Sequence, residues 1–291
     1  MTEDRSAMSR RSFLKLMGML IGETILFGVA GMQFAKRIEP AWIEVTQVRL
    51  KLPRLGKGFN GFRIVQVSDI HMGYWMTVDR FNHAMELALG QEPDLLALTG
   101  DFIESSFAEV DPSAAVDNLS QVFDKMGNVP RVGVMGNHDL RTAPSAVRAL
   151  LKKHDILELT NAVHTLERGG DRLHIAGVDD LREGQPDLPK VMSALPEDGA
   201  AIMLAHEPDF ADKSAATGRF DLQISGHSHG GQVIMPFIGP LYLTYGGRKY
   251  YSGLYQVGNM LQYTNRGIGM TAVYYRVNCR PEITVYTLEA G

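Results

Sequence analysis

The 291-residue sequence is short of cysteine and of net charge, and each shortage excludes a class of protein. Its single cysteine, Cys279, can form neither an intramolecular disulfide nor a cysteine-based zinc cluster. A bound metal ion would therefore need histidine, aspartate, glutamate or asparagine ligands. The formal net charge is only −4, from 29 Lys and Arg against 33 Asp and Glu, without obvious blocks of one sign. This balance argues against nucleic acid as a partner, because such binding depends on neutralising phosphates.

The N-terminus also lacks a full-length apolar span. Residues 16–32 are mostly apolar, but the run includes Glu23 and follows the basic residues Arg10, Arg11 and Lys15. A spanning helix needs about 20 apolar residues, and a central carboxylate costs it on the order of 2.5–3.5 kcal/mol. The segment SRRSFLK at 9–15 resembles the signal read by the twin-arginine translocase, which exports folded proteins. The alternative is an uncleaved anchor in the membrane.

Both interpretations predict a protein of the cell envelope. It would be exported by the twin-arginine route or anchored to the cytoplasmic membrane by residues 16–32. We therefore expect residues 1–36 to form the signal peptide or anchor, and residues 37–291 to form one folded domain.

Strand-like and helix-like patterns alternate along the remaining chain. Helical periodicity occurs at 78–89, 113–126 and 144–154. Short apolar stretches rich in β-branched residues occur at 62–67, 95–99, 131–135, 163–166, 173–176, 201–204 and 222–224. This alternation predicts an α/β fold whose sheet is covered by helices on its outer faces.

Side chains that can bind metals follow five of these stretches. The segments are SDIH at 68–71, GD at 100–101, GNHD at 136–139, AHEPD at 205–209 and SGHSHGG at 225–231. The carboxyl ends of strands converge on one crevice in α/β sheets, so we expect these side chains to meet there. A set of carboxylates, an amide and imidazoles suits Mn²⁺, Fe or Zn²⁺. So many ligands favour two ions that share a carboxylate, an arrangement used to hydrolyse phosphoesters.

The five motifs in this order are the signature of the calcineurin-like metallophosphoesterases, which the sequence resembles. It is most similar to a bacterial branch with an N-terminal export or anchor segment, which includes exported phosphodiesterases and UDP-2,3-diacylglucosamine hydrolases. The resemblance covers about residues 44–288 and includes the segments at 61–65, 230–232, 266–269 and 280–283. Glu104 departs from the pattern, because many members have Asp there, and we expect it to lie behind the ligands.

The resemblance implies a two-sheet β-sandwich flanked by helices, in four αββα layers, with two divalent metal ions at one end. The ions would be Mn, Zn or Fe. One would be held by Asp69, His71, Asp101 and His229. The other would be held by Asp101, Asn137, His206 and His227. Asp101 would thus bridge the two ions, and a hydroxide between them would attack phosphorus.

The resemblance also implies a catalytic pair. His138 would contact the phosphate or protonate the leaving oxygen, and Asp139 would fix the tautomer and orientation of His138. The predicted activity is that of a phosphodiesterase or phosphatase. Because no large cap is inserted between the motifs, the substrate could be lipid-linked or cell-wall-linked. Two alternatives stay open, a UDP-2,3-diacylglucosamine pyrophosphatase of lipid A synthesis and a metal-binding scaffold without turnover. The His138–Asp139 pair argues against the scaffold.

Overall fold

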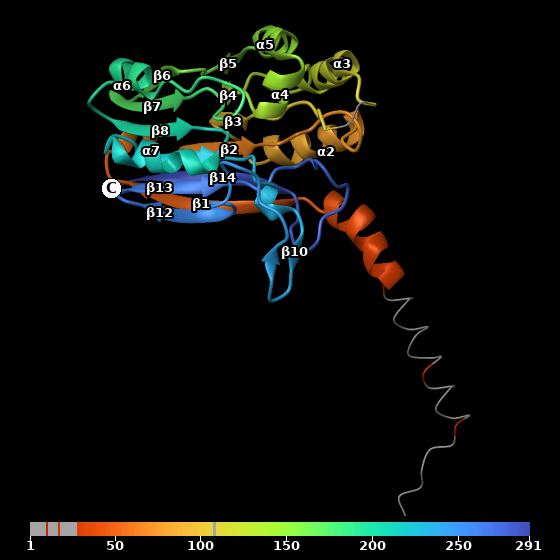
Figure 1. Ribbon diagram of the computed structural model, residues 1–291. Helices are drawn as coiled ribbons and strands as arrows, with labels where there is room; N and C mark the ends of the chain where they lie inside the picture. Colours follow the sequence, from red (N-terminus) through yellow and green to blue (C-terminus); the bar gives the residue numbers. More distant parts are fainter. Residues whose placement is uncertain (1–9, 11–16, 18–27, 107–108) are drawn as a thin grey trace, which may run out of the picture.

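The computed structural model describes residues 10, 17, 28–106 and 109–291, and within them two six-stranded sheets form the body of the molecule (Figure 1). The first sheet has the strand order β1-β14-β2-β3-β4-β5. Its strands are β1 (Glu44–Leu52), β2 (Arg63–Val67), β3 (Leu95–Thr99), β4 (Arg131–Val134), β5 (Ile156–Glu158) and β14 (Glu282–Ala290).

The second sheet has the order β12-β13-β9-β8-β7-β6. Its strands are β6 (Ala162–Arg168), β7 (Asp171–Gly177), β8 (Ala200–Leu204), β9 (Leu222–Ser225), β12 (Gly253–Val257) and β13 (Met260–Thr264). Strands β7, β8, β9 and β13 pair in parallel, as do β2, β3, β4 and β5 of the first sheet.

Helices cover the outer face of each sheet. The first sheet packs on α2 (Val78–Leu89), α3 (Pro112–Phe123) and α5 (Pro144–Lys153), whose side chains share one core cluster with β2 and β3. The second packs on α6 (Leu188–Ala194) and α7 (Ala211–Ala216). The shorter helical segments are α4 (Asn137–Thr142), η3 (Lys57–Phe59), η4 (Pro208–Phe210) and η5 (His229–Gly231).

Strand β8 shows why these residues form a central strand of a sandwich. Its alternate residues Ala200, Ile202 and Leu204 enter the core between the two sheets, while Ala201 and Met203 enter the core beneath the helices. A strand buried on both faces reads as a continuous apolar run, with successive side chains on opposite sides. The predicted α/β fold, a two-sheet sandwich flanked by helices, is therefore confirmed.

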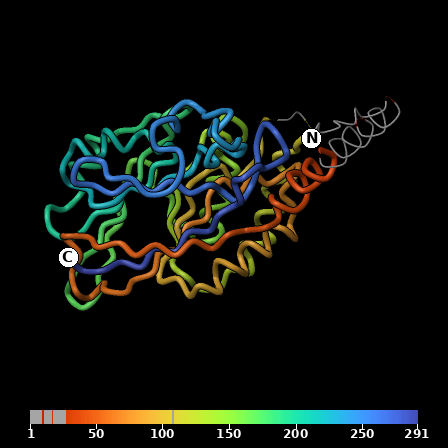
Figure 2. The backbone as a smooth tube through the Cα atoms, turned by 90° about the horizontal axis from the view of Figure 1, so that it is seen from below, coloured from red at the N-terminus to blue at the C-terminus, as the bar shows by residue number. Residues whose placement is uncertain are grey.

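The last strand does not follow the chain order. Strand β14 lies between β1 and β2, parallel to the first and antiparallel to the second. Figure 2 shows β1 and β14 running side by side from one end of the molecule toward the other. The two ends of the domain are thus held together in one sheet, which places the start of β1 close to the loops that precede β14.

Two segments project from the same side of the molecule (Figure 1). One is the N-terminal helical segment, which comprises helical residues 28–33, η1 (Phe34–Ile38) and η2 (Glu39–Ala41). The other is a hairpin of β10 (Ile234–Met235) and β11 (Gly239–Pro240).

Most of the predicted signal or anchor lies outside the described residues, and the division at residue 36 stays a prediction. Among the residues that the structure does describe, no helix is both long and apolar enough to cross a membrane.

Candidate metal centre

The five motifs of the sequence meet at one end of the sandwich, where both sheets present the carboxyl ends of their parallel strands. Asp69 and His71 follow β2, Asp101 follows β3, and Asn137 follows β4 at the start of α4. From the second sheet, His206 follows β8, and His227 and His229 follow β9. All seven side chains are buried. The structure therefore brings the seven predicted metal ligands to one place.

The backbone is strained at most of these positions. Asp69, His71, Asp101, His227 and His229 all have positive φ angles, between 50° and 68°. This region is unfavourable for residues other than glycine, at a cost of about 1–3 kcal/mol each, and such residues cluster at functional sites.

Glycines let the strained loops approach one another closely. A Cβ atom at Gly226 would overlap Asp69 and Ser68, and one at Gly136 would overlap Asp101. Because glycine has no Cβ, the carboxylates can lie directly against these turns.

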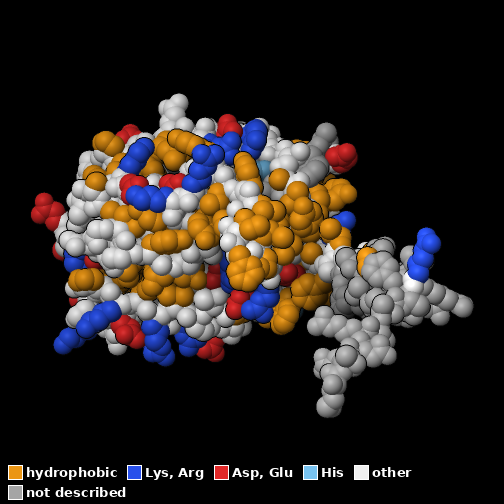
Figure 3. All heavy atoms as spheres, turned by 60° about the horizontal axis from the view of Figure 1, so that its bottom comes forward, with side chains coloured by type: hydrophobic (Ala, Val, Ile, Leu, Met, Phe, Trp, Pro, Cys, Tyr) orange, Lys and Arg blue, Asp and Glu red, His pale blue; other side chains and the backbone are white. Residues whose placement is uncertain are grey.

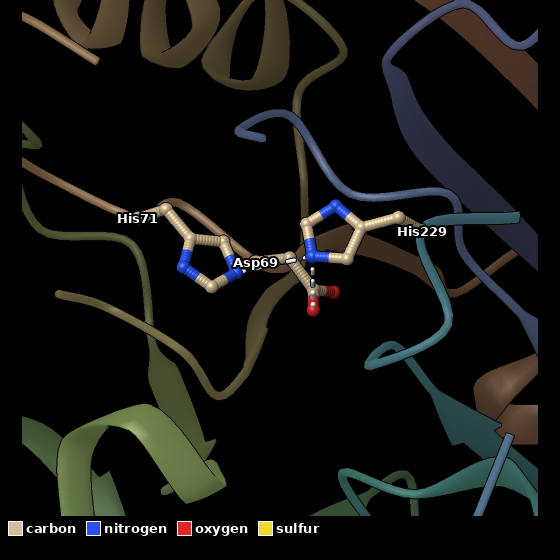
Figure 4. A group of neighbouring side chains, drawn as sticks. All are labelled: Asp69, His71 and His229. Carbon is tan, nitrogen blue, oxygen red and sulfur yellow. Dashed lines mark hydrogen bonds and ion pairs between the residues drawn. The ribbon is translucent and has the colours of Figure 1, made fainter. Parts of the chain in front are cut away.

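Asp69, His71 and His229 form the first group of candidate ligands (Figure 4). The Nε2 atoms of His71 and His229 are 3.0 Å apart, and His229 Nε2 is 3.5 Å from Asp69 Oδ1. The backbone N–H of His227 donates to both carboxylate oxygens of Asp69, which fixes that side chain. Three donor atoms therefore face one point from β2 and β9.

Asp101, His206 and His227 form the second group. His206 Nδ1 donates to the carbonyl of Thr99 at 2.7 Å, so Nε2 carries the lone pair and faces Asp101 Oδ2 at 3.2 Å. His227 Nε2 donates to the carbonyl of Tyr245 at 2.9 Å, which leaves its Nδ1 as the lone-pair atom. Backbone carbonyls behind both rings thus set the tautomers that metal ligands need.

Asp101 lies between the two groups. Its Oδ1 accepts a hydrogen bond from the backbone N–H of His138, while Oδ2 lies 3.5 Å from His71 Nε2 and 3.2 Å from His206 Nε2. The same oxygen therefore faces one imidazole of each group.

Several polar atoms of this centre have no partner although they are buried. Among the described side chains, Asn137 Oδ1 and His206 Nε2 have no hydrogen-bond partner. A buried polar atom without a partner is costly, so groups of this kind need an explanation. Nitrogen and oxygen donors of these types suit a divalent cation such as Mn²⁺, Zn²⁺ or Fe²⁺, and the residues present fit one.

The electrostatics of the cluster also favour bound positive charge. Burial would lower the pKa of His71, but the carboxylates of Glu104, Asp101 and Asp69 outweigh it and raise that pKa to about 9. By contrast, burial and the neighbouring His206 lower the pKa of His227 to about 3. The carboxylates thus attract cations, while His227 stays neutral and able to ligate.

His138 lies at the edge of the centre, and its ring packs edge-on against His71 with the centroids 4.6 Å apart. Its Nδ1 accepts from the backbone N–H of Ser105 at 3.2 Å and lies 2.8 Å from Ser105 Oγ. Ser105 therefore contacts the Nδ1 side of the ring, and its N–H also donates to Glu104 Oε1 at 2.8 Å.

Glu104 stands behind two of the rings. Its Oε2 is 3.3 Å from His71 Nδ1 and its Oε1 is 3.5 Å from His138 Nδ1. The carboxyl is almost fully buried and lies behind the ligands, as expected from the sequence. A carboxylate in this position orients a ligating imidazole and increases its basicity.

The expectation that Asp139 orients His138 is wrong. Asp139 Oδ1 accepts from the backbone N–H groups of Phe102 and Ile103, and Oδ2 accepts from Gly136. The reason is its place as the third residue of α4, from which a carboxylate reaches back to the start of its own helix. Asp139 therefore holds the loop that follows β3 against the loop that follows β4, while Ser105 and Glu104 contact His138.

Ser105 was not predicted to belong to the centre. The only available signal was its place directly after Glu104, in the loop that leaves the carboxyl end of β3. The four histidines outside the strand ends are at 83, 154, 164 and 174, and none belongs to the groups of candidate ligands among the described residues. His174, for example, is buried and bonded at both ring nitrogens, to Thr165 Oγ1 and to the carbonyl of Asp198.

Comparisons with known proteins agree with this centre. A sequence profile of the calcineurin-like phosphoesterases matches residues 62–231. The chain is 35% identical over 285 residues to the uncharacterized metallophosphoesterase YkuE of Bacillus subtilis (strain 168), with 97% of this chain and 98% of that protein covered. It is 30% identical over 285 residues to the phosphodiesterase YaeI of Escherichia coli (strain K12), with 96% and 99% covered.

One solved structure, the 5′-nucleotidase precursor from Thermus thermophilus, superposes with a TM-score of 0.46 at 14% identity, over 71% of this chain and 49% of that one. On the sequence matches, the chain belongs to the calcineurin-like phosphoesterases, a family of metal-dependent hydrolases of phosphoric ester bonds.

Proposed function

We propose that the protein is a phosphodiesterase with two divalent metal ions, exported to or anchored at the cell envelope. The observation that carries this proposal is the position of Asp101 Oδ2, which faces His71 of one group and His206 of the other. A shared carboxylate of this kind is the hallmark of a two-ion site. The seven ligands would be Asp69, His71, Asp101, Asn137, His206, His227 and His229.

When bound, two such ions lower the pKa of a water molecule and withdraw electron density from the phosphoryl oxygens. The side chains of the protein hold the ligands in position and supply a proton. Hydrolysis forms one bond from phosphorus to the water oxygen and breaks the bond to the leaving oxygen, which needs a proton unless it leaves as a stable anion. His138 would supply that proton from Nε2 in its protonated, imidazolium form, while Nδ1 faces Ser105 Oγ and Glu104 Oε1. Glu104 would hold the rings of His71 and His138 in place.

A diester is the preferred substrate in this proposal. The relative from Escherichia coli bears the name phosphodiesterase. Lys249 is not free to neutralise the extra charge of a monoester, because its Nζ is bound to the carboxylate of Asp212 at 2.7 Å. With Mn²⁺ present, we expect faster hydrolysis of bis(p-nitrophenyl) phosphate than of p-nitrophenyl phosphate, measured as kcat/KM from nitrophenolate release.

A preference for the monoester would contradict the assignment as a phosphodiesterase. If neither ester is hydrolysed but the pyrophosphate bond of UDP-2,3-diacylglucosamine is, the protein is the UDP-2,3-diacylglucosamine pyrophosphatase that the sequence left open as an alternative.

Export by the twin-arginine route would place the domain outside the cytoplasmic membrane. The paired Arg10 and Arg11 of the signal are its most sensitive positions, so we expect the double substitution Arg10→Lys and Arg11→Lys to retain the protein inside the cell. Protease added to spheroplasts should degrade the wild-type domain and spare the variant. If the domain is protected in both, it faces the cytoplasm, and the proposal of export is wrong.

A further inference from the structure

The hairpin of β10 and β11 and the residues that follow it expose large apolar side chains to solvent. Phe237 at its tip is fully exposed, Ile238 is 74% exposed, and the adjoining Leu241 and Tyr242 are 60% and 70% exposed. Each strand of the hairpin has only two residues. Soluble surfaces rarely leave such a cluster in water, so this one indicates an interaction site.

The N-terminal helical segment extends this apolar surface. The loop between β13 and β14 joins the two, since Val277 O accepts from Ile234 N at 2.9 Å and Arg276 N donates to Ala35 O at 3.0 Å. The segment exposes the further apolar side chains of Val29, Met32, Phe34 and Ile38, and Trp42 directly after it is exposed as well. Figure 3 shows apolar side chains gathered on this face, next to the start of the described chain. We call this surface, from the helical segment to the hairpin, the apolar face.

A mostly apolar groove has lining residues both at the metal centre and on the apolar face. Its volume is about 240 Å³, and its lining includes the candidate ligand His229 and Thr244, which contacts His227. The lining also includes Val233, Leu241 and Val273, and of these Leu241 belongs to the exposed surface next to the hairpin. A molecule with its phosphate at the metal centre could therefore extend an apolar tail toward the apolar face.

Three features favour a lipid bilayer over a protein partner on the apolar face. The mostly apolar run at 16–32 of the sequence ends in the helical residues 28–32, which belong to this face. Trp42 lies on it with the guanidinium of Arg280 4.7 Å from the ring centroid, and Tyr242 adds an apolar ring with a polar tip. Trp and Tyr of this kind, with basic side chains beside them, are typical of the boundary between lipid and water.

We propose that the apolar face rests in a lipid bilayer and that the groove takes a hydrocarbon chain of a membrane phosphodiester. This inference rests on the proposed function, because it presumes that the phosphate of the substrate lies at Asp101 and the surrounding histidines. The substrate class is then a phosphodiester with a long hydrocarbon chain, which the protein would hydrolyse while the molecule remains in the membrane. The hairpin would enter the headgroup region and bring the mouth of the groove to the level of the chains.

The bilayer contact is tested on the full chain with a fluorescent label. Cys279, the single cysteine, is buried, so a thiol-reactive, polarity-sensitive dye will label an introduced cysteine selectively. We expect the dye at Ile238→Cys to brighten several-fold and shift to the blue on addition of vesicles of phosphatidylcholine and phosphatidylglycerol. Nitroxide-labelled lipid should quench it. The matched control, Leu254→Cys on the edge strand β12, should not respond. An unchanged signal at position 238 would overturn the proposal, even if the protein binds the vesicles through its N-terminus.

The groove is tested with alkyl p-nitrophenyl phosphates, which are diesters that differ only in chain length. We expect kcat/KM to rise at least tenfold from the methyl to the octyl ester, because each methylene that enters the groove is removed from water. Val273→Trp fills the groove and should remove most of this rise, whereas Leu254→Trp should keep it. A rate independent of chain length, with the methyl ester still hydrolysed, would overturn the inference alone. If no ester of the series is hydrolysed, the proposed function itself fails.

Discussion

Substitution of Asp101 by alanine is expected to abolish hydrolysis and to release metal from both groups of ligands. Asp101 Oδ2 faces His71 and His206, so its loss removes an oxygen that both proposed ions would share. Its Oδ1 also fixes the backbone N–H of His138. We expect kcat/KM for the diester to fall on the order of 10³-fold or more, since metal positioning and charge stabilisation are lost together. Metal content after dialysis and the rate are measured on the same sample.

The matched control for this prediction is Asp212→Ala. Asp212 is a half-exposed aspartate on α7 that binds Lys249 and Tyr250, away from the ligands. This variant should keep both metal content and rate. If Asp101→Ala retains two ions and hydrolyses the diester at the wild-type rate, the bridging role of Asp101 is refuted.

Substitution of His138 by alanine is expected to lower the rate while both ions remain bound. The side chain touches His71, Ser105 and Glu104 but is not among the seven ligands. Loss of a general acid costs about 10²–10⁴-fold, but only for a leaving group that must be protonated. The rate of hydrolysis should therefore fall by this factor for a diester with an alkyl leaving group. It should fall much less for a diester that releases p-nitrophenolate, which leaves as a stable anion.

Two outcomes would change the role of His138. Equal losses for both leaving groups would mean that it contacts the phosphate rather than protonates the leaving oxygen. Undiminished hydrolysis of the alkyl diester would remove it from the mechanism. His164→Ala, a change at a half-buried histidine on β6, controls for loss of an imidazole elsewhere.

The sequence predicted the position of the candidate ligands well because two local signals coincide there. An apolar run predicts a buried strand, and the polar residues directly after it must lie at the carboxyl end of that strand. Asp69 after β2 and His206 after β8 were located in this way, although they belong to different sheets. The two-layer arrangement of those sheets came from the family resemblance, since strand periodicity alone does not say which strands pair.

The contacts between side chains within the centre were harder to predict than the positions of the candidate ligands. The family resemblance implied that Asp139 orients His138, but neighbouring residues on the first turn of a helix point in different directions. Asp139 consequently binds the backbone of its own helix start and of Phe102, while Ser105 from another loop reaches His138. Such contacts depend on the conformation of two loops at once, which no local pattern records.

The groove and the apolar face could not be predicted for a similar reason. Val233, Leu241 and Val273 are scattered in the sequence, and the loop between β13 and β14 has no regular periodicity. Their proximity depends on β14, which inserts between β1 and β2 and brings this loop beside both the N-terminal helical segment and the hairpin.

The claim that two divalent ions drive phosphodiester hydrolysis is tested most directly by titrating Mn²⁺ into metal-free protein while the rate on bis(p-nitrophenyl) phosphate is followed. Two groups of ligands joined by Asp101 predict that activity rises until two ions are bound per chain. Full activity with a single bound ion, or the same rate with and without metal, would contradict the account.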